Sequence, residues 1–139
     1  MASEISGEEE KWVVAESELE GTPMVLRAGI HFQDLPDLRS RLPIRIGVAI
    51  PFAEGQDLSD PRLVDLEERL EPASGHRAHI VMIVSQPGFK EWMLHAGSHD
   101  WLAEFHQTLI KEFSEYEIQL VGEHDPAWSS YFELLSWLS

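Results

Sequence analysis

The spacing of apolar and polar residues along the chain predicts a series of β-strands. In IRIGVAIPF, at residues 44–52, every second side chain is large and apolar, so we expect one face of this strand to lie against a core. RAHIVMIVSQ, at residues 77–86, is apolar on both faces, which is typical of a strand that is covered on both sides. The other predicted strands are residues 12–16, 23–28, 89–96 and 116–122.

Apolar residues spaced by three and four positions predict two helices between these strands. Asp60 is expected to cap the first helix and Pro61 to open it, because both residue types favour a helix start. Ser98 is expected to cap the second. The apolar stripe of the first helix is Leu63, Leu66 and Leu70. The stripe of the second is Leu102, Phe105, His106, Leu109, Ile110 and Phe113.

From residue 44 onward the predicted order is strand, helix, strand, strand, helix, strand. This order is typical of the α+β class and of the ferredoxin-like split βαβ fold, in which two helices pack on one face of an antiparallel sheet. The first two strands, which turn at Gly21, form an N-terminal β-hairpin that extends one edge of the sheet; the pattern does not say which. Residues 31–43 contain two prolines and are expected to run along the surface as a linker.

Length and composition predict one folded domain. At 139 residues the chain can bury a core of its own, so residues 11–139 are interpreted as a single α+β domain. Residues 1–10 are polar and acidic and are interpreted as a flexible tail.

The last part of the chain, DPAWSSYFELLSWLS, predicts a short C-terminal helix. Asp125 and Pro126 repeat the helix-start pattern, so the helix is expected to begin near Pro126, and together with Trp128 and Tyr131 they are interpreted as a structural terminal motif. The expected stripe is Trp128, Tyr131, Phe132, Leu135 and Leu138.

Leu134 and Trp137 lie beside that stripe, and two interpretations of them stay open. In the first, the helix sits in a crevice that buries both groups, as aromatic residues usually are. Alternatively, Trp137 and Leu134 contact a protein partner or a second copy of the chain.

Charge narrows the range of partners. The chain has 10 basic and 25 acidic residues and a net charge of −15. Phosphate backbones and anionic membrane surfaces repel such a protein, so we expect it to bind neither nucleic acid nor membranes, whereas a basic protein segment would be attracted. The chain has no cysteine, no apolar stretch long enough to span a membrane and no signal-peptide pattern at its start, so a cytoplasmic location is expected.

Chemically active residue patterns are not evident in the sequence. The seven histidines include His95 and His99, four positions apart, and His124 beside Asp125, but their spacing does not match a zinc site. We therefore expect no catalytic residue, no metal site and no cofactor. A small enzyme or ligand-binding protein that uses these histidines near the second helix remains an alternative.

Several segments in order carry a family resemblance: Trp12, GTPMVLR, LPIRIGVAIPF, LEERLE, GFKEWMLHA and DPAWSSY. With them the chain resembles the domain of unknown function 695, a bacterial family without an established activity, over nearly its whole length. It departs from that family at His95, where similar sequences usually carry an aromatic residue.

A second resemblance covers only DPAWSSYFE. This segment is similar to the terminal motif of the regulator of ribonuclease E activity B family, whose acidic, ferredoxin-like members inhibit a ribonuclease by binding it. We expect a non-catalytic binding or regulatory module that acts through protein–protein contacts, and the second resemblance implies, as an alternative, a protein inhibitor of a nuclease.

Overall fold

The computed structural model describes residues 11–19, 21–52 and 61–138. The predicted tail at residues 1–10 and the predicted cap Asp60 lie outside the described residues. The strands are β1 (Trp12–Leu19), β2 (Thr22–Gly29), β3 (Ile44–Pro51), β4 (Ala78–Gln86), β5 (Phe89–Ala96) and β6 (Gln119–His124). The helices are η2 (Ile30–Asp34), α2 (Pro36–Ser40), α3 (Pro61–Ala73), α4 (Leu102–Glu112), α5 (Ser129–Leu135) and η3 (Ser136–Leu138), of which η2 and η3 are 3₁₀ helices.

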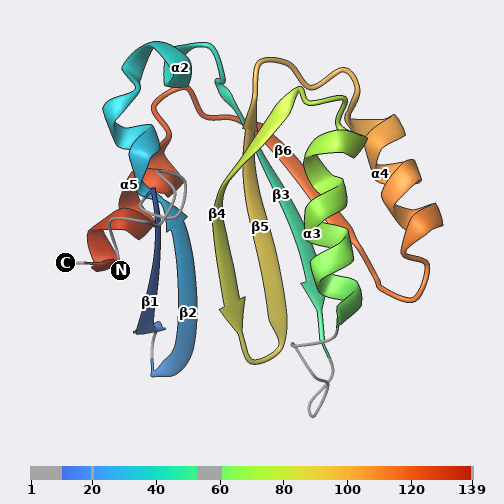
Figure 1. Cartoon of the computed structure of the whole chain (residues 1–139), viewed down its shortest axis with the longest axis horizontal. Coiled ribbons are helices and arrows are strands. Elements are labelled where there is room, and N and C mark those ends of the chain that lie inside the picture. The colour runs from blue at the N-terminus through green and yellow to red at the C-terminus, as the bar shows by residue number, and fades with distance from the viewer. Residues whose placement is uncertain (1–10, 20, 53–60, 139) are drawn as a thin grey trace, which may run out of the picture.

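The described strands form one six-stranded sheet in the order β1-β2-β4-β5-β3-β6, and every neighbouring pair is antiparallel (Figure 1). The part β4-β5-β3-β6, with α3 and α4 as its connections, has the predicted split βαβ arrangement. The α+β class is therefore confirmed. The N-terminal hairpin joins the sheet at β4, through the pairing of β2 with β4.

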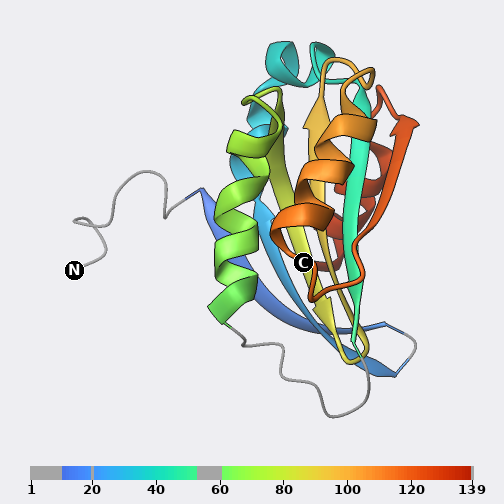
Figure 2. The same ribbon diagram turned by 90° about the vertical axis from the view of Figure 1, so that its right-hand side faces the viewer.

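Helices α3 and α4 cover one face of the sheet, and α5 lies against the other (Figure 2). The face of β3 that the alternating pattern predicted to be apolar is buried under α3 and α4, together with the predicted leucine stripe of α3. We call this the α3 face. Its core residues from β3 and α3 are Ile44, Ile46, Val48, Ile50, Leu63, Leu66 and Leu70.

The opposite side, the α5 face, has a second core in which aromatic rings are prominent. Helix α5 and the segment that follows β2 pack there against β2, β4 and β5. Its buried residues are Met24, Leu26, Ala28, Phe32, Leu42, Val81, Met82, Val84, Met93, Trp128 and Tyr131. The described part of the chain thus builds two cores on one sheet.

Several local predictions were wrong. Helix α4 begins at Leu102 and has no side-chain cap at its start, so Ser98 does not cap it. Ile110, placed on the buried stripe of this helix, is 39% exposed. The predicted linker instead folds into η2 and α2, because Phe32 and Leu42 are drawn into the second core.

Two further elements begin at later residues than predicted. The last strand begins at Gln119, and the preceding Ile118 is buried in the α3-face core. The terminal helix begins at Ser129 and not near Pro126. None of the helices in the described ranges has the length and apolar character needed to cross a membrane.

Candidate functional site

The terminal motif forms a tight turn that starts α5. The Trp128 N–H donates to the Asp125 carbonyl at 3.1 Å, and the Ser129 N–H donates to Asp125 Oδ1 at 3.0 Å. The Asp125 N–H donates in turn to the Pro43 carbonyl at 2.7 Å, which attaches the turn to the start of β3. Trp128 has a φ of 56°, in the left-handed region, which costs a residue with a side chain on the order of 1–3 kcal/mol.

Tertiary contacts hold Trp128 in this conformation. Its side chain is fully buried and stacks on His95, with ring centroids 3.9 Å apart. Its indole N–H is shared between the Leu42 carbonyl at 3.0 Å and the Arg39 carbonyl at 3.2 Å. Tyr131 is also fully buried and donates its hydroxyl to the Gly29 carbonyl at 2.7 Å. These two aromatic residues bind the segment between β2 and β3 as well as filling the core.

His95 is the buried histidine of this cluster. Its Nδ1 donates to the Leu42 carbonyl at 2.8 Å, and its Nε2 has no hydrogen-bond partner. Burial lowers the pKa of His95 to about 4, so the ring is neutral at neutral pH.

The three histidines of the enzyme alternative do not share a site. His95 is buried on the α5 face, whereas His99 and His124 are exposed. His124 pairs with Ile44, and His95 pairs with Arg45, so their side chains lie on opposite faces of the sheet. Across residues 11–19, 21–52 and 61–138, no group of three or more His, Asp or Glu residues could hold a metal ion.

The exposed side of α5 differs from the predicted one. Leu134 and Trp137, the predicted contact residues, are half-buried and pack against the second core. Phe132, predicted to be on the buried stripe, is instead 38% exposed, and the Arg39 guanidinium lies 5.1 Å from the centre of its ring. The helix starts three residues later than expected and after a left-handed residue, which changes the direction in which each side chain points.

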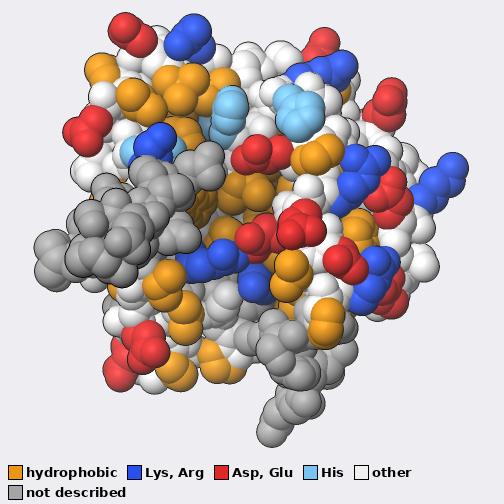
Figure 3. Space-filling view, viewed as in Figure 1, with side chains coloured by type: hydrophobic (Ala, Val, Ile, Leu, Met, Phe, Trp, Pro, Cys, Tyr) orange, Lys and Arg blue, Asp and Glu red, His pale blue; other side chains and the backbone are white. Residues whose placement is uncertain are grey.

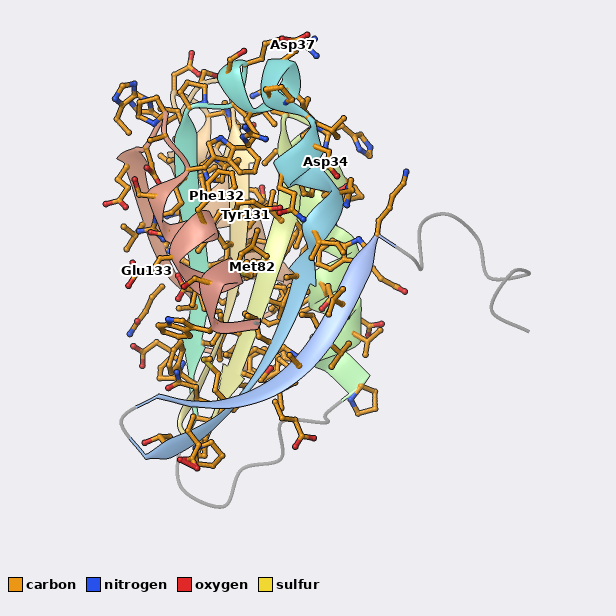
Figure 4. The ribbon with its side chains drawn as sticks, turned by 90° about the vertical axis from the view of Figure 1, so that its left-hand side faces the viewer. Asp34, Asp37, Met82, Tyr131, Phe132 and Glu133 are labelled. Atoms are coloured by element: carbon orange, nitrogen blue, oxygen red, sulfur yellow. The ribbon has the colours of Figure 1, made fainter. Side chains whose placement is uncertain are left out.

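Three acidic residues lie on α5 and on the elements next to it, apart from the Phe132 ring (Figure 4). Glu133 follows Phe132 on α5, while Asp34 and Asp37 come from the neighbouring η2 and α2. We call Phe132, Asp34, Asp37 and Glu133 the terminal-helix surface. No sequence signal identified Asp34 and Asp37, because they are brought to α5 only by the folding of the predicted linker.

A second cluster of charged residues lies on the α3 face, and sequence reasoning missed it. Arg27 of β2 makes an ion pair with Glu67 of α3, and the Trp92 indole N–H donates to the same Glu67 oxygen at 2.9 Å. Lys90 lies with its ammonium group 5.4 Å from the centre of the Trp92 ring. The alternation of β2 and β5 could have placed these cations on one face, but not the contact with α3.

A small hollow is present where α3 ends and α4 begins, with a volume of about 200 Å³. Arg77, Trp101 and Glu104 are among the residues that line it. The buried Ser74 also lines it, and the indole Nε1 of Trp101 is buried without a hydrogen-bond partner. Ligand pockets usually exceed about 300 Å³, so this hollow is smaller than a usual ligand site.

A model of the protein family described as "Family of unknown function (DUF695)" matches residues 10–136. The chain therefore belongs to this family. No curated protein matches the chain. The similarity of the terminal segment to the regulator of ribonuclease E activity B family is not shown by these comparisons.

Proposed function

We propose that this member of a family of unknown function is a non-catalytic module that binds a basic segment of another protein through its terminal-helix surface. The observation that carries the proposal is the position of Phe132. It is more exposed than any other Phe, Tyr or Trp in the described residues, on a helix whose neighbouring Tyr131 is fully buried. Exposed aromatic residues with polar surroundings are typical anchors of protein interfaces.

The charge around Phe132 supports a basic partner. Asp34, Asp37 and Glu133 lie on α5 and on the neighbouring η2 and α2, and the whole chain carries a net charge of −15. Such a field speeds the approach of a positively charged segment and repels acidic ones. Two cations lie in this region: the Arg39 guanidinium donates to the carbonyls of Phe32 and Gln33 at 2.7 and 2.8 Å, and the Arg41 guanidinium donates to the Asp37 carbonyl at 3.2 Å.

The residues of the DPAWSSYFE segment divide into two groups by position. Asp125 caps α5, and Trp128 and Tyr131 are buried, so the packing of the fold accounts for them. Phe132 and Glu133 are exposed, and packing does not account for their positions. They are the part of the segment that a partner, including a nuclease with a basic surface, would touch.

The environment of the histidines supports a non-catalytic role. His95 is buried and neutral, and it does not meet His99 or His124. A general base must lie within hydrogen-bond distance of its substrate, and a buried side chain such as His95 is not accessible to one. The chain also has no cysteine, which suits a reducing compartment, so we propose that the module acts in the cytoplasm.

Binding to a basic probe tests the proposal. The probe is a fluorescent peptide of alternating arginine and leucine residues, titrated with the wild-type chain, with Phe132→Ala and with Ile110→Ala. Ile110 is the matched control, because it is 39% exposed against 38% for Phe132 but lies on α4. We expect Phe132→Ala to weaken binding at least about 10-fold, as for an interface anchor, and Ile110→Ala to leave it unchanged.

Equal binding by the two variants would refute the proposed surface. Binding that is insensitive to salt would refute the electrostatic part of the proposal. Sedimentation of the protein alone provides a further check: a dimer that Phe132→Ala dissociates would show that the surface binds a second copy of the chain and not a basic partner.

A further inference from the structure

The sheet ends at β6, and one side of this strand has no neighbouring strand in the described part of the chain. Among the described strands, β6 pairs with β3 alone. The Asp125 N–H donates to the Pro43 carbonyl, in register with that pairing. Backbone groups of alternate residues point to the same side of a strand, so those of Leu120, Gly122 and His124 point away from β3. An unpaired edge of this kind is a template for another strand.

Strand β6 lacks the features that usually protect a sheet edge. It contains no proline, lysine or arginine, and its pairing with β3 has no bulge. Its one carboxylate, Glu123, is bound by Arg45 of β3 at 2.8 Å. The other edge strand, β1, carries the exposed Glu16 and Glu18, which would repel the same residues of a second copy. Of the two edges, β6 is therefore the one open to pairing.

A second copy of β6 fits this edge in one antiparallel register. Centred on Val121, the pairing sets the two Val121 side chains opposite each other, at a position without cross-strand hydrogen bonds, where side chains come closest. Val121 is 56% exposed in the single chain. Leu120 then exchanges hydrogen bonds with Gly122 of the second copy, and Gln119 lies opposite its Glu123. No two carboxylates of the paired strands face each other.

The neighbouring registers fit less well, and the charge of the edge favours a second copy over a basic segment. A pairing centred on Gly122 places Val121 against Glu123, and one centred on Leu120 joins only residues 119–121 of each strand. Because Glu123 is already bound to a cation, a basic segment would meet little free negative charge at this edge. Figure 3 shows that basic and acidic side chains are mixed over α3 and α4, so charge does not select that surface either.

Helix α4 adds an apolar side chain on the α3 face of the same edge. Its Glu112 binds Arg69 of α3, whereas the His106 Nε2 donates to the backbone carbonyl just before β6 at 2.8 Å. These contacts mark opposite sides of the helix. Ile110 follows His106 by one turn, so it lies on the outer side, and it is 39% exposed. In an antiparallel pair the start of one strand lies beside the end of the other, so Ile110 would lie near His124 of the second copy.

We propose that β6 pairs with β6 of a second copy of this chain and continues the antiparallel sheet across a two-fold axis. Helices α3 and α4 lie side by side over the four strands from β4 to β6 (Figure 1). A helix is about 10 Å wide, or two strand spacings, so the two α4 helices of the dimer lie about 10 Å apart, a packing distance for helices. The paired strands are short, so the interface is smaller than the roughly 1,200 Å² of a stable complex and the dimer forms only at high protein concentration.

Sedimentation equilibrium over a range of protein concentrations tests the proposal. We expect the mean mass of the wild-type chain to rise towards that of a dimer. Val121→Lys should weaken association at least about 10-fold, because it sets two like charges opposite each other. Val14→Lys is the matched control, since it makes the same change at a valine that is 64% exposed on the other edge strand. Both positions are exposed, so both variants should fold, which circular dichroism checks.

Two further measurements distinguish strand pairing from other kinds of association. Added salt should strengthen the dimer, because it screens the repulsion between two chains of net charge −15, whereas salt weakens the binding of a basic partner. In amide exchange followed by NMR, Leu120 and Gly122 should exchange more slowly as the protein concentration rises. Val121, whose backbone N–H faces β3, should show no such change.

Each alternative outcome would overturn the proposal. A chain that remains a monomer at every concentration, or a dimer that added salt dissociates, would refute strand pairing between like-charged copies. Equal weakening by Val121→Lys and Val14→Lys would place the contact elsewhere than β6. Dissociation by Phe132→Ala would assign the dimer to the terminal-helix surface, where the Phe132 ring lies beside Arg39. Because the two proposals use different residues and respond to salt in opposite directions, the failure of one leaves the other standing.

Discussion

The two faces of the sheet both bury aromatic rings, but the polar atoms of these rings have different partners. On the α3 face, Leu66 and Leu70 share a core with the buried Trp92, whose indole N–H donates to the Glu67 side chain. On the α5 face, Trp128 and Tyr131 fill the core and donate hydrogen bonds to backbone carbonyls. The packing of the α5 face therefore depends on backbone carbonyls placed to within a few tenths of an ångström, whereas the packing of Leu66 and Leu70 depends on volume and shape.

The difference follows from what each face must cover. The α3 face meets regular strands and helices, whose backbone groups are already paired. The α5 face meets residues 29–42, which form only short helical turns, so their carbonyls need other donors. Trp128, Tyr131 and His95 supply these donors to Gly29, Arg39 and Leu42. Aromatic residues with a polar atom can fill a core and satisfy irregular backbone at once.

The largest expected effect is the loss of Trp128. Trp128→Ala should lower the free energy of unfolding by about 3–5 kcal/mol, because it removes a fully buried aromatic ring and its bonds to Leu42 and Arg39. Urea denaturation followed by circular dichroism measures this loss. Trp128→Phe should also be costly, whereas Leu66→Met on the α3 face should cost less than about 1.5 kcal/mol. Similar costs for these two conservative changes would break the comparison of the faces.

The next effect is a loss of stability in acid. The pKa of His95 is about 4 in the folded chain against 6.5 in the unfolded chain, so between these values only the unfolded chain takes up the proton. Stability should fall by about 3 kcal/mol as the pH drops from 6.5 to 4, and no further below that through this group. His95→Gln removes this contribution, and His106→Gln, on α4, is the control. A wild-type pH profile that matches that of His95→Gln would contradict the buried, neutral state of His95.

A smaller effect is expected for the hydroxyl of Tyr131. Tyr131→Phe keeps the buried ring but leaves the Gly29 carbonyl without its 2.7 Å donor, so stability should fall by about 1–2 kcal/mol. Thermal melting of the wild-type and variant chains measures the difference. No change in the melting temperature would show that the hydrogen bond to Gly29 adds nothing to the apolar packing of the α5 face.

The smallest effects on stability are expected at Trp137 and Phe132. Trp137→Ala should cost about 1 kcal/mol, because the ring is half-buried against the second core, and Phe132→Ala should cost less. Melting and light scattering of both variants separate a packing role from a contact role. A change in self-association caused by Trp137→Ala, with stability intact, would favour the contact role predicted for Trp137 and Leu134 and would move the proposed interface away from Phe132.

Prediction from sequence was most accurate where one repeating pattern decides burial. The four alternating residues of β3, the following Phe52 and the leucine stripe of α3 are buried as expected. A repeat of two residues in a strand or 3.6 in a helix places these side chains on one face, whichever element packs against it. It failed at Ser98, Ile110 and Phe132. Each of these lies in or near the first or last turns of a helix. There a single tertiary contact can change where the helix begins or ends, and so which side chains are buried.

The candidate sites were less predictable than the fold. Trp128 and Tyr131 could be named as fold residues from the sequence, since large aromatic residues at helical spacing are usually buried. The terminal-helix surface could not be named, because it combines residues from elements that are distant in sequence. Arg39 and Phe132, for example, come together only after the segment that follows β2 has folded against α5.

The sequence by itself determined the class of the fold, the order of its strands and helices along the chain and the residues that face the α3 core. These features depend on the spacing of apolar residues, which can be recognised within a stretch of about ten residues. Only the tertiary structure decided that the hairpin joins β4, that Trp128 adopts a left-handed conformation and that Arg27 pairs with Glu67. Those features depend on contacts such as the one from Trp128 to Arg39, 89 residues apart, which form only when the whole sheet closes.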